Sequence, residues 1–257
     1  MVTRDTAWHP GTPCWVDLSV DDAERASTFY AGLFGWDVEI DPDPNFGGHG
    51  NFSINGKSVA GVSPNMEKGM PSAWATFLAS DDIERTAGKI TSAGGQLVTE
   101  IMDIGEHGRM LVASDPAGAV FGVWQSGLHT GVRLANENNT LTWNENLSLD
   151  YEGNKKFYTE VFGYEYNDMG DDGFSYSTLE LNGGPVGGIG ELAEESAMPA
   201  HWMSYFAVVD TDASVAKALE LGGTVLKSAF DTPQGRIAIL ADDQGAAFAL
   251  VSVPAEN

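Results

Sequence analysis

The sequence is poor in cysteine, in long apolar runs and in basic residues. Its single cysteine, Cys14, excludes a disulfide bond within the chain and favours a reducing compartment. No stretch reaches the roughly 18 consecutive apolar residues of a membrane-spanning helix. The first ten residues lack the basic start and apolar run of a secretory signal. We therefore expect a cytoplasmic protein with no membrane partner.

Basic side chains are scarce: 13 lysines and arginines stand against 37 aspartates and glutamates, for a formal net charge of −24. A field of this sign repels phosphate backbones and anionic lipid headgroups. The sequence thus argues against nucleic acid as a partner, and solubility explains the acidic surface. The hydrophobic fraction of 42% over 257 residues is enough for a proper core.

What the chain does contain is repetition. Four apolar stretches open with a tryptophan: Trp15, Trp74, Trp143 and Trp202. The spacing is 59 within each half (74 − 15 and 202 − 143) and 128 between halves (143 − 15). An offset of 128, which becomes 127 before Gly108, aligns nearly the whole chain with itself. This predicts a tandem duplication, with domains at 1–127 and 141–257 and a polar linker at 128–140.

Each half divides again into two modules. In residues 15–20, WVDLSV, apolar and polar side chains alternate as in a strand with one buried face. Asp21 or Asp22 then precedes a helical stretch that ends at Gly35. Three short strand-like segments follow, separated by turns. Because this order recurs, we predict an α+β fold of four β-α-β-β-β modules, forming two U-shaped mixed sheets with helices on their outer faces.

Strand alternation also predicts which side chains line each cleft. The helix-facing set in the first two long strands is Val16, Leu18, Val20, Ala75, Phe77 and Ala79. The concave set is Trp15, Asp17, Ser19, Trp74, Thr76 and Leu78. A mixed aromatic and polar surface is typical of a ligand cleft. The alternative is that the tryptophans only fill the inside of the sheet, and their recurrence does not decide between the two.

Two sequence motifs resemble a known family. The strand–helix stretches VDDAERASTFYAGLFGW and LDYEGNKKFYTEVFGY are similar to those of the vicinal oxygen chelate superfamily, which includes glyoxalase I, extradiol dioxygenases and bleomycin-resistance proteins. The stretches DPAGAVFGVWQ and DDQGAAFALVSV resemble its closing turn and last strand. The match covers essentially the whole chain and is closest to two-domain actinobacterial members. It implies a U-shaped sheet around a cleft in each domain.

The resemblance also implies one divalent metal per cleft, which polarises substrate oxygens or activates dioxygen. The ligand positions fall on Trp15, Trp74, Trp143, Trp202, Gly122, Ala249, Ser53 and Glu180. Of these only Glu180 can bind a metal, because indole offers no lone pair. The histidines are expected in the N-terminal tail, turns and linker, with the fifth pointing away from its cleft: His9, His49, His107, His129 and His201. We therefore expect no metal and no cofactor.

The remaining residues favour a metal-independent cleft that binds or sequesters a small molecule. Asp17 and Glu145 follow their tryptophans by two residues, and Gly122 and Ala249 leave room for a planar group. The predicted ligand-binding set is Trp15, Asp17, Trp74, Gly122, Trp143, Glu145, Trp202 and Ala249. Indole walls suit flat rings and a negative wall suits a cation, so we expect an aromatic or cationic ligand.

The alternative is a metal-dependent glyoxalase-like lyase, dioxygenase or hydroxylase that holds Zn, Ni, Fe or Mn with unusual ligands. Glu180, Asp17, Glu145 and the histidines would then have to converge. Asp17 and Glu145 equally fit a structural role as acceptors for indole N–H groups. A third reading has one active copy and one scaffold, since Ser53 matches Glu180. The sequence leaves open a monomer with packed domains or a homodimer.

Overall fold

The computed structural model describes residues 2–40, 48–65, 67, 69–170, 173–193 and 198–252. Domain 1 consists of β2 (Pro13–Val20), α1 (Ala23–Phe34), β3 (Asp37–Ile40), β4 (Gly50–Ile54), β5 (Lys57–Pro64), β6 (Ala73–Ser80), α2 (Ile83–Ser92), β7 (Gln96–Leu97), β8 (Met102–Asp103), the 3₁₀ turn Gly105–His107, β9 (Gly108–Ser114) and β10 (Val120–Ser126). Domain 2 consists of β12 (Leu141–Ser148), α3 (Tyr151–Phe162), β13 (Glu165–Asp168), β14 (Tyr176–Leu181), β15 (Gly184–Glu191), β16 (His201–Ala207), α4 (Thr211–Glu220), β17 (Thr224–Thr232), β18 (Gly235–Ala241) and β19 (Ala247–Ser252). The short strands β1 (Val2–Thr3) and β11 (Leu134–Ala135) pair with each other outside these sheets.

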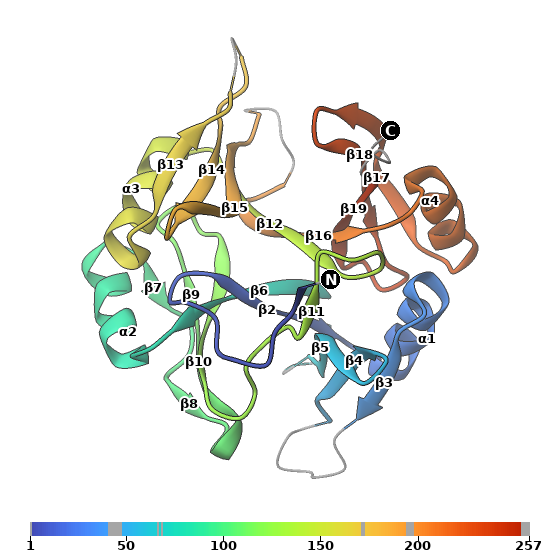
Figure 1. Ribbon diagram of the computed structural model, residues 1–257, viewed down its shortest axis with the longest axis horizontal. Helices are drawn as coiled ribbons and strands as arrows, with labels where there is room; N and C mark the ends of the chain where they lie inside the picture. Colours follow the sequence, from blue (N-terminus) through green and yellow to red (C-terminus); the bar gives the residue numbers. More distant parts are fainter. Residues whose placement is uncertain are drawn as a thin grey trace.

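The predicted duplication is confirmed as two mixed sheets with matching strand orders. The first runs β3-β4-β5-β2-β6-β10-β9-β7, with β8 added beside β9, and the second runs β13-β14-β15-β12-β16-β19-β18-β17. In each sheet the first strands of the two modules, β2 with β6 and β12 with β16, pair antiparallel at the centre. Each sheet thus consists of the strands of two modules placed side by side (Figure 1). This confirms the predicted α+β architecture.

The four helices begin and end where the sequence provides caps. Asp22, Asp82, Asp150 and Asp210 each accept a hydrogen bond from the backbone N–H three residues later. Helices α1 and α3 end at Gly35 and Gly163, whose φ angles of 72° and 79° lie in the left-handed region. The caps fix where each preceding strand stops.

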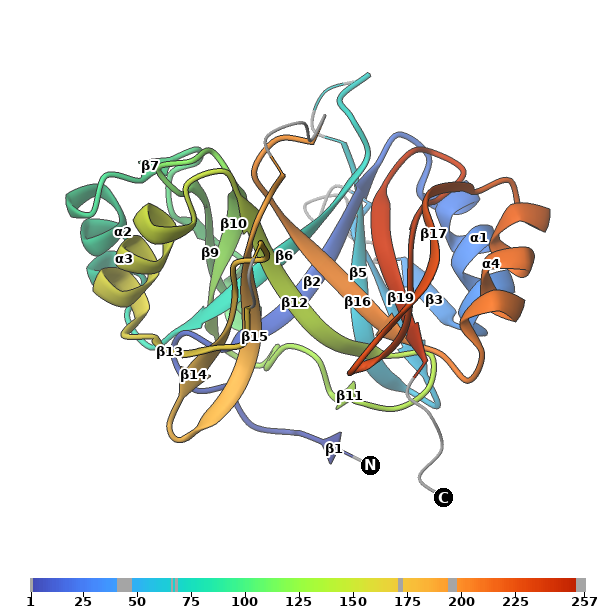
Figure 2. The same ribbon diagram turned by 90° about the horizontal axis from the view of Figure 1, so that it is seen from above.

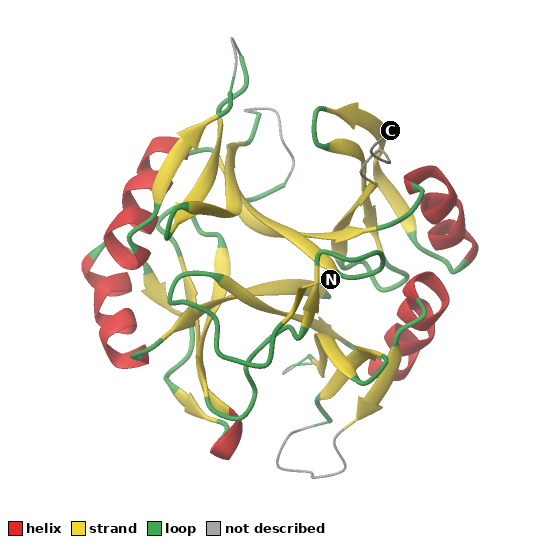
Figure 3. Cartoon of the chain, in the orientation of Figure 1, coloured by secondary structure: helices red, strands yellow, loops and turns green. Residues whose placement is uncertain are grey.

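The two sheets stand back to back, with their central strands crossing between them (Figures 1 and 2). Thr76 of β6 donates to Asn144 of β12 across this junction at 2.9 Å. Helix α1 packs beside α4 on one flank, and α2 packs beside α3 on the other (Figure 3). Each helix therefore covers the convex face of its own sheet and also meets a helix of the other domain.

Among the described residues, the two larger hydrophobic cores are shared between the domains. One core joins the first module of domain 1 to the second module of domain 2, and the other joins the remaining two modules. Phe29 of α1 contacts Phe248 of β19 at a ring distance of 6.4 Å, and Phe157 of α3 contacts Phe121 of β10 at 6.2 Å. The recurrent phenylalanines of the sequence motifs thus hold the domains together.

The predicted faces of β6 and β16 are wrong, because the alternation along each strand is shifted by one residue and the two faces are exchanged. In the sheet Trp15 lies opposite Phe77 and Asp17 lies opposite Ala75, and paired residues share a face. Phe77 and Ala75 therefore lie on the concave side, whereas Trp74, Thr76 and Leu78 lie in the core. Domain 2 repeats this arrangement: Met203 lies opposite Glu145 on the concave side, and Trp202 is buried between the sheets.

Counting back from the helix caps explains the error. Trp15 precedes Asp22 by seven residues (22 − 15), but Trp74 precedes Asp82 by eight (82 − 74). The same difference separates Trp143 and Trp202 from their caps (150 − 143 and 210 − 202). Because side chains alternate along a strand, the odd residue reverses the face. His201 shares the side of Met203, so its predicted orientation away from the cleft is also wrong.

None of the helices in the described part of the chain is long and apolar enough to cross a membrane.

Candidate ligand clefts on the concave faces

The concave face of domain 1 is built around Asp17. Its Oδ2 lies 3.0 Å from His49 Nε2, and its Oδ1 accepts a hydrogen bond of 2.7 Å from the Ser63 hydroxyl. The Trp15 indole N–H reaches Oδ2 at 3.4 Å. The side chains of Asp17 and His49 remain 12% and 32% exposed. The pair is thus held in place, with His49 the more exposed of the two.

Gly61 makes room for this pair. It lies opposite Asp17 in the parallel strand β5. A Cβ at this position would stand 2.0 Å from Asp17 Oδ2 and 3.1 Å from His49 Nε2. Any other residue would push the carboxylate and the imidazole apart, so glycine here is a requirement of the site.

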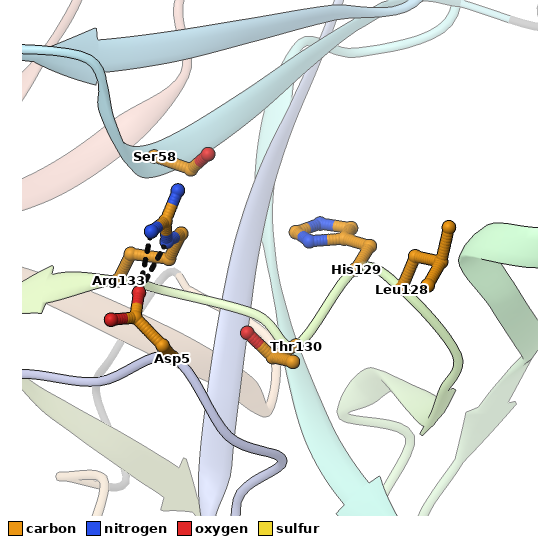
Figure 4. A pocket seen from close by; sticks show the side chains of 6 residues that line it. All are labelled: Asp5, Ser58, Leu128, His129, Thr130 and Arg133. Carbon is orange, nitrogen blue, oxygen red and sulfur yellow. Dashed lines mark hydrogen bonds and ion pairs between the residues drawn. The ribbon is translucent and has the colours of Figure 1, made fainter.

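The interdomain linker closes one side of this cleft with His129. The imidazole meets the Trp15 ring edge-on at a centroid distance of 4.4 Å, and Trp124 of β10 donates to the His129 carbonyl at 2.9 Å. A cavity of about 340 Å³ lies against it. Its walls are Asp5, Ser58, Leu128, His129, Thr130 and Arg133 (Figure 4). Arg133 donates a hydrogen bond to Asp5 at 2.9 Å, so the opposite charges of these two wall residues are paired with each other.

His129 is neutral at pH 7. Burial, followed by the nearby charges of His49 and His107, lowers its pKa to about 4, although Asp17 acts in the opposite direction. Its Nδ1 accepts the Gly131 N–H at 3.3 Å, so the neutral ring carries its hydrogen on Nε2. The wall formed by Trp15 and His129 is therefore aromatic and uncharged.

The concave face of domain 2 is built in the same way around Glu145. Tyr205 donates to Glu145 Oε1 at 3.0 Å, and the Tyr176 hydroxyl also bonds this carboxyl group. The Trp143 indole N–H donates to the Tyr176 oxygen at 3.1 Å. Gly188 lies opposite Glu145, and a Cβ there would stand 2.1 Å from the Tyr176 oxygen. Burial raises the pKa of Glu145.

The rest of this face is apolar. Met203, Tyr205, Ala249 and Val251 form a small hydrophobic cluster with Trp143, Met198, Ile237, Ile239 and Ala247 packed against it. In domain 1 the position equivalent to Ala249 is Gly122, and a Cβ there would lie 2.1 Å from the Phe77 ring. The expectation that Gly122 opens space for a ligand is therefore wrong, because Phe77 occupies that space.

Of the predicted ligand-binding set, Trp15, Asp17 and Gly122 come together in domain 1, and Trp143, Glu145 and Ala249 come together in domain 2. Trp74 and Trp202 do not join them. Sequence reasoning missed His49, Ser63 and His129, which reach the cleft from a loop end, a strand and the linker. It also missed Tyr176 and Tyr205. Around β4 and β14 the offset is locally 127, because Asn51 lies opposite Gly61 and Thr178 lies opposite Gly188, and this makes His49 and Tyr176 equivalent. The Asn-Gly turns at 55–56 and 182–183 were the available signal for this local offset.

The residues at the metal positions do not fit a metal. The corrected concave positions hold Trp15, Ala75 and Gly122 in domain 1, and Trp143, Met203 and Ala249 in domain 2, which together offer no oxygen or nitrogen ligand. Glu180 accepts a hydrogen bond from Thr178 at 2.6 Å. Within the described ranges, no group of three or more His, Cys, Asp and Glu side chains is arranged to hold a metal ion.

The recurrent arginines are also placed. Arg109 pairs with Glu84 at 2.7 Å and Arg236 pairs with Asp212 at 2.7 Å, in both cases an acid of the neighbouring helix. They act on the surface and not in the clefts.

Comparison with known proteins agrees with the fold and the duplication. Residues 13–123 match the model of the Glyoxalase/Bleomycin resistance protein/Dioxygenase superfamily, and residues 148–251 match that of the Glyoxalase-like domain. The protein named "Putative glyoxylase CFP32" of Mycobacterium tuberculosis (strain CDC 1551 / Oshkosh) is 40% identical over 254 residues, which cover 96% of this chain and 97% of that protein. The "Anthracycline biosynthesis protein DnrV" of Streptomyces peucetius is 36% identical over 262 residues, covering 96% and 95%.

Among solved structures, the Mn(II)-bound glyoxalase from Novosphingobium aromaticivorans has a TM-score of 0.66 at 16% identity, covering 95% of this chain and 83% of that one. The 2,2',3-trihydroxybiphenyl 1,2-dioxygenase from Sphingomonas wittichii strain RW1 has a TM-score of 0.64 at 15% identity, covering 95% and 91%. These two likenesses concern the fold alone. Together with the family models and the relatives, they lead to one conclusion: the chain belongs to the glyoxalase/bleomycin resistance protein/dioxygenase superfamily.

Proposed function

We propose that this protein binds an aromatic small molecule in the domain 1 cleft without the help of a metal. The observation that carries the proposal is the uncharged aromatic pair of Trp15 and His129 beside Asp17, together with a cavity of about 340 Å³ that His129 lines. A planar ring gains apolar contact and stacking from such a wall. Asp17 offers an acceptor for a ligand N–H or O–H group.

The relatives support an aromatic ligand. One of them is named for anthracycline biosynthesis, and anthracyclines are fused-ring aromatic compounds. A cationic ring system would gain further from the net charge of −24 and from Asp17. We therefore propose a planar ring compound, neutral or cationic, as the ligand. In domain 2 the apolar cluster around Trp143 would offer a second, less polar face.

The alternative remains a metal-dependent lyase, dioxygenase or hydroxylase, as in the fold neighbours that bind Mn(II) or carry dioxygenase names. The donor set described above speaks against it. Metal dependence is accordingly part of the test and not of the proposal.

The test is calorimetric titration of EDTA-treated protein with two planar probes, cationic proflavine and anionic 9,10-anthraquinone-2-sulfonate, at high ionic strength to suppress unspecific attraction. We expect saturable binding of at least one probe, weakened roughly 10-fold or more by Trp15→Leu, since a lost aromatic contact costs about 1.5 kcal/mol. The matched variant Trp143→Leu removes the equivalent indole of domain 2 and should not weaken the same binding event. Binding that appears only after Mn(II), Zn(II), Ni(II) or Fe(II) is added would refute the proposal.

A further inference from the structure

The cavity against His129 is polar on most of its walls. Asp5 follows β1, Ser58 lies in β5, and the other wall residues belong to the linker between β10 and β11: Leu128, His129, Thr130 and Arg133 (Figure 4). Two hydroxyl groups, a carboxylate and a guanidinium thus surround one space of about 340 Å³. This volume lies within the range of about 300–1,000 Å³ that small-molecule pockets occupy.

Backbone contacts hold these walls in place. The Arg133 N–H donates to the Ser58 carbonyl at 2.8 Å, and the Arg4 N–H donates to the Arg133 carbonyl at 3.1 Å. Gly131 brings the linker close to β2, since a Cβ there would stand 2.3 Å from the Cys14 carbonyl oxygen. The linker is therefore fixed between the N-terminal segment and domain 1, and the cavity is formed before a ligand arrives.

The charges on the walls cancel but leave hydrogen-bonding groups in reach. Arg133 directs Nε and Nη2 to the same oxygen of Asp5, Oδ1. Within the described part of the chain, Asp5 Oδ2 and Arg133 Nη1 make no other hydrogen bond or ion pair. An anionic ligand would meet the carboxylate and a cationic one the guanidinium. The pair thus favours a neutral group that can both donate and accept hydrogen bonds.

Hydroxyl groups and an apolar edge complete the cavity. Ser58 and Thr130 are half-buried, and their hydroxyls have no hydrogen-bond partner among the described residues. Leu128, with 70% of its surface exposed, lies beside His129 on the side away from Arg133 in Figure 4. A sugar ring has the matching chemistry, because each of its hydroxyls donates and accepts while its C–H groups make apolar contacts.

The equivalent place in domain 2 has a different character. Gly61 and Gly188 both lie opposite the cleft acid, so Ser58 is equivalent to Pro185 (58 + 127). Pro185 lines a cavity of about 190 Å³ whose described walls carry no ionisable side chain. They are Trp8, Thr12, Pro13, Val132, Ala135, Asn136, Leu141, Thr142, Trp143, Asn144, Pro185 and Val186. The polar walls are therefore a property of domain 1 and not of the repeated module.

We propose that the cavity of domain 1 binds a neutral saccharide, carried as a glycosyl group by the planar ligand. The proposal rests on the proposed function for the aromatic part of the ligand and adds the chemical class of its substituent. Vicinal sugar hydroxyls bond Asp5 Oδ2 and Arg133 Nη1, and the hydroxyls of Ser58 and Thr130 bond the rest of the ring. The C–H groups of the sugar lie against Leu128.

A matched pair of neutral planar probes tests this assignment. 7-Methoxy-4-methylcoumarin and the 4-methylumbelliferyl glycosides differ only in whether the ring oxygen carries a methyl or a glycosyl group. The glycosides of glucose, galactose and rhamnose would be titrated calorimetrically into EDTA-treated protein. We expect at least one glycoside to bind roughly 10-fold or more tightly than the methoxycoumarin, because several hydrogen bonds are gained.

Variants locate the sugar. Asp5→Ala should remove most of this preference, and Ser58→Ala and Leu128→Ala should each weaken glycoside binding roughly 3- to 10-fold. All three should leave methoxycoumarin binding unchanged, and circular dichroism would verify their folding. The matched control is Asp212→Ala in α4, which makes the same charge change at a similarly exposed arginine partner, 63% against 65%, outside both cavities. It should bind both probes like the wild type.

Two results would overturn the inference while leaving the proposed function intact. One is binding of the methoxycoumarin as tight as that of every glycoside. The other is a glycoside preference that Asp5→Ala, Ser58→Ala and Leu128→Ala leave unchanged, since the sugar would then lie elsewhere. Failure of the coumarin, the glycosides, proflavine and anthraquinone sulfonate all to bind would overturn the proposed function and the inference together.

Discussion

Tyr158 in α3 of domain 2 donates a buried hydrogen bond of 3.0 Å to Asp115, which follows β9 of domain 1. The same tyrosine accepts the Trp202 indole N–H at 2.8 Å. Equivalent hydrogen bonds join the other two modules: the Trp74 indole donates to the Tyr30 hydroxyl at 2.9 Å, and Tyr30 donates to Asp242 at 3.0 Å. Each aspartate also caps its own turn through backbone N–H groups. The Phe-Tyr and Asp-x-x-Gly motifs thus lock the two domains together.

Removing either tyrosine hydroxyl should loosen this lock. Tyr158→Phe and Tyr30→Phe each leave a buried indole N–H without its acceptor, at a cost of about 1–3 kcal/mol in the free energy of unfolding. Tyr30→Phe should lower the free energy of unfolding at least as much as Tyr158→Phe. When Tyr158 is changed, Asp115 keeps its hydrogen bonds from Asn146 and Asn154, whereas Asp242 loses the hydrogen bond from Tyr30. Urea unfolding followed by circular dichroism measures both. Two variants as stable as the wild type would contradict this role.

Much of the architecture was predictable because it depends on local and repeated signals. Helix caps, the glycines after α1 and α3, and the self-alignment at 127 and 128 recur in both halves and are confirmed. The face of β6 was predicted wrongly, because one additional residue between Trp74 and the helix cap exchanges the two faces of the strand. The recurrence of tryptophan at the start of each strand suggested the same face for all four.

The site was less predictable than the fold. Trp15, Asp17, Trp143 and Glu145 follow from alternation along one strand. His49 and His129 enter the cleft only through tertiary contacts, one from the segment before β4 and the other from the linker that crosses back to domain 1. Nothing local marks a turn or linker histidine as part of a site.

Gly61 offers a test of how closely Asp17 and His49 are packed. Gly61→Ala should displace Asp17 or His49 and cost on the order of 1–3 kcal/mol, as overpacking does. The expected readouts are a lower urea midpoint and a changed His49 imidazole signal in nuclear magnetic resonance spectra.

The matched control is Gly88→Ala, on the exposed face of α2, where an added Cβ meets nothing within 4 Å. It should stabilise the protein by about 0.5–1 kcal/mol through helix propensity. If Gly61→Ala were equally harmless, the pair would be looser than described.

The neutral His129 predicts a pH dependence of stability. Its pKa is lowered to about 4 in the folded protein, against about 6.5 unfolded, so between these values the unfolded chain binds a proton that the folded protein does not. Its contribution to stability is therefore complete above pH 6.5 and is lost as the pH falls towards 4.

The raised pKa values of Asp115, Asp242 and Glu145 act in the opposite direction. The comparison of wild type with His129→Gln isolates the histidine. Urea unfolding at pH 7 and pH 4.5 should show a larger loss of stability for the wild type than for the variant. Equal losses would mean that His129 titrates as an ordinary histidine.

The central claim is that the concave clefts work without a metal, and metal content tests it most directly. The protein would be purified without chelator or His-tag, incubated with Zn(II), Ni(II), Fe(II) and Mn(II), desalted and analysed by mass spectrometry. We predict trace metal only, because indole, alanine, glycine and methionine occupy the ligand positions. Near-stoichiometric metal, retained by the wild type and lost in Glu180→Ala or Asp17→Asn, would contradict the account.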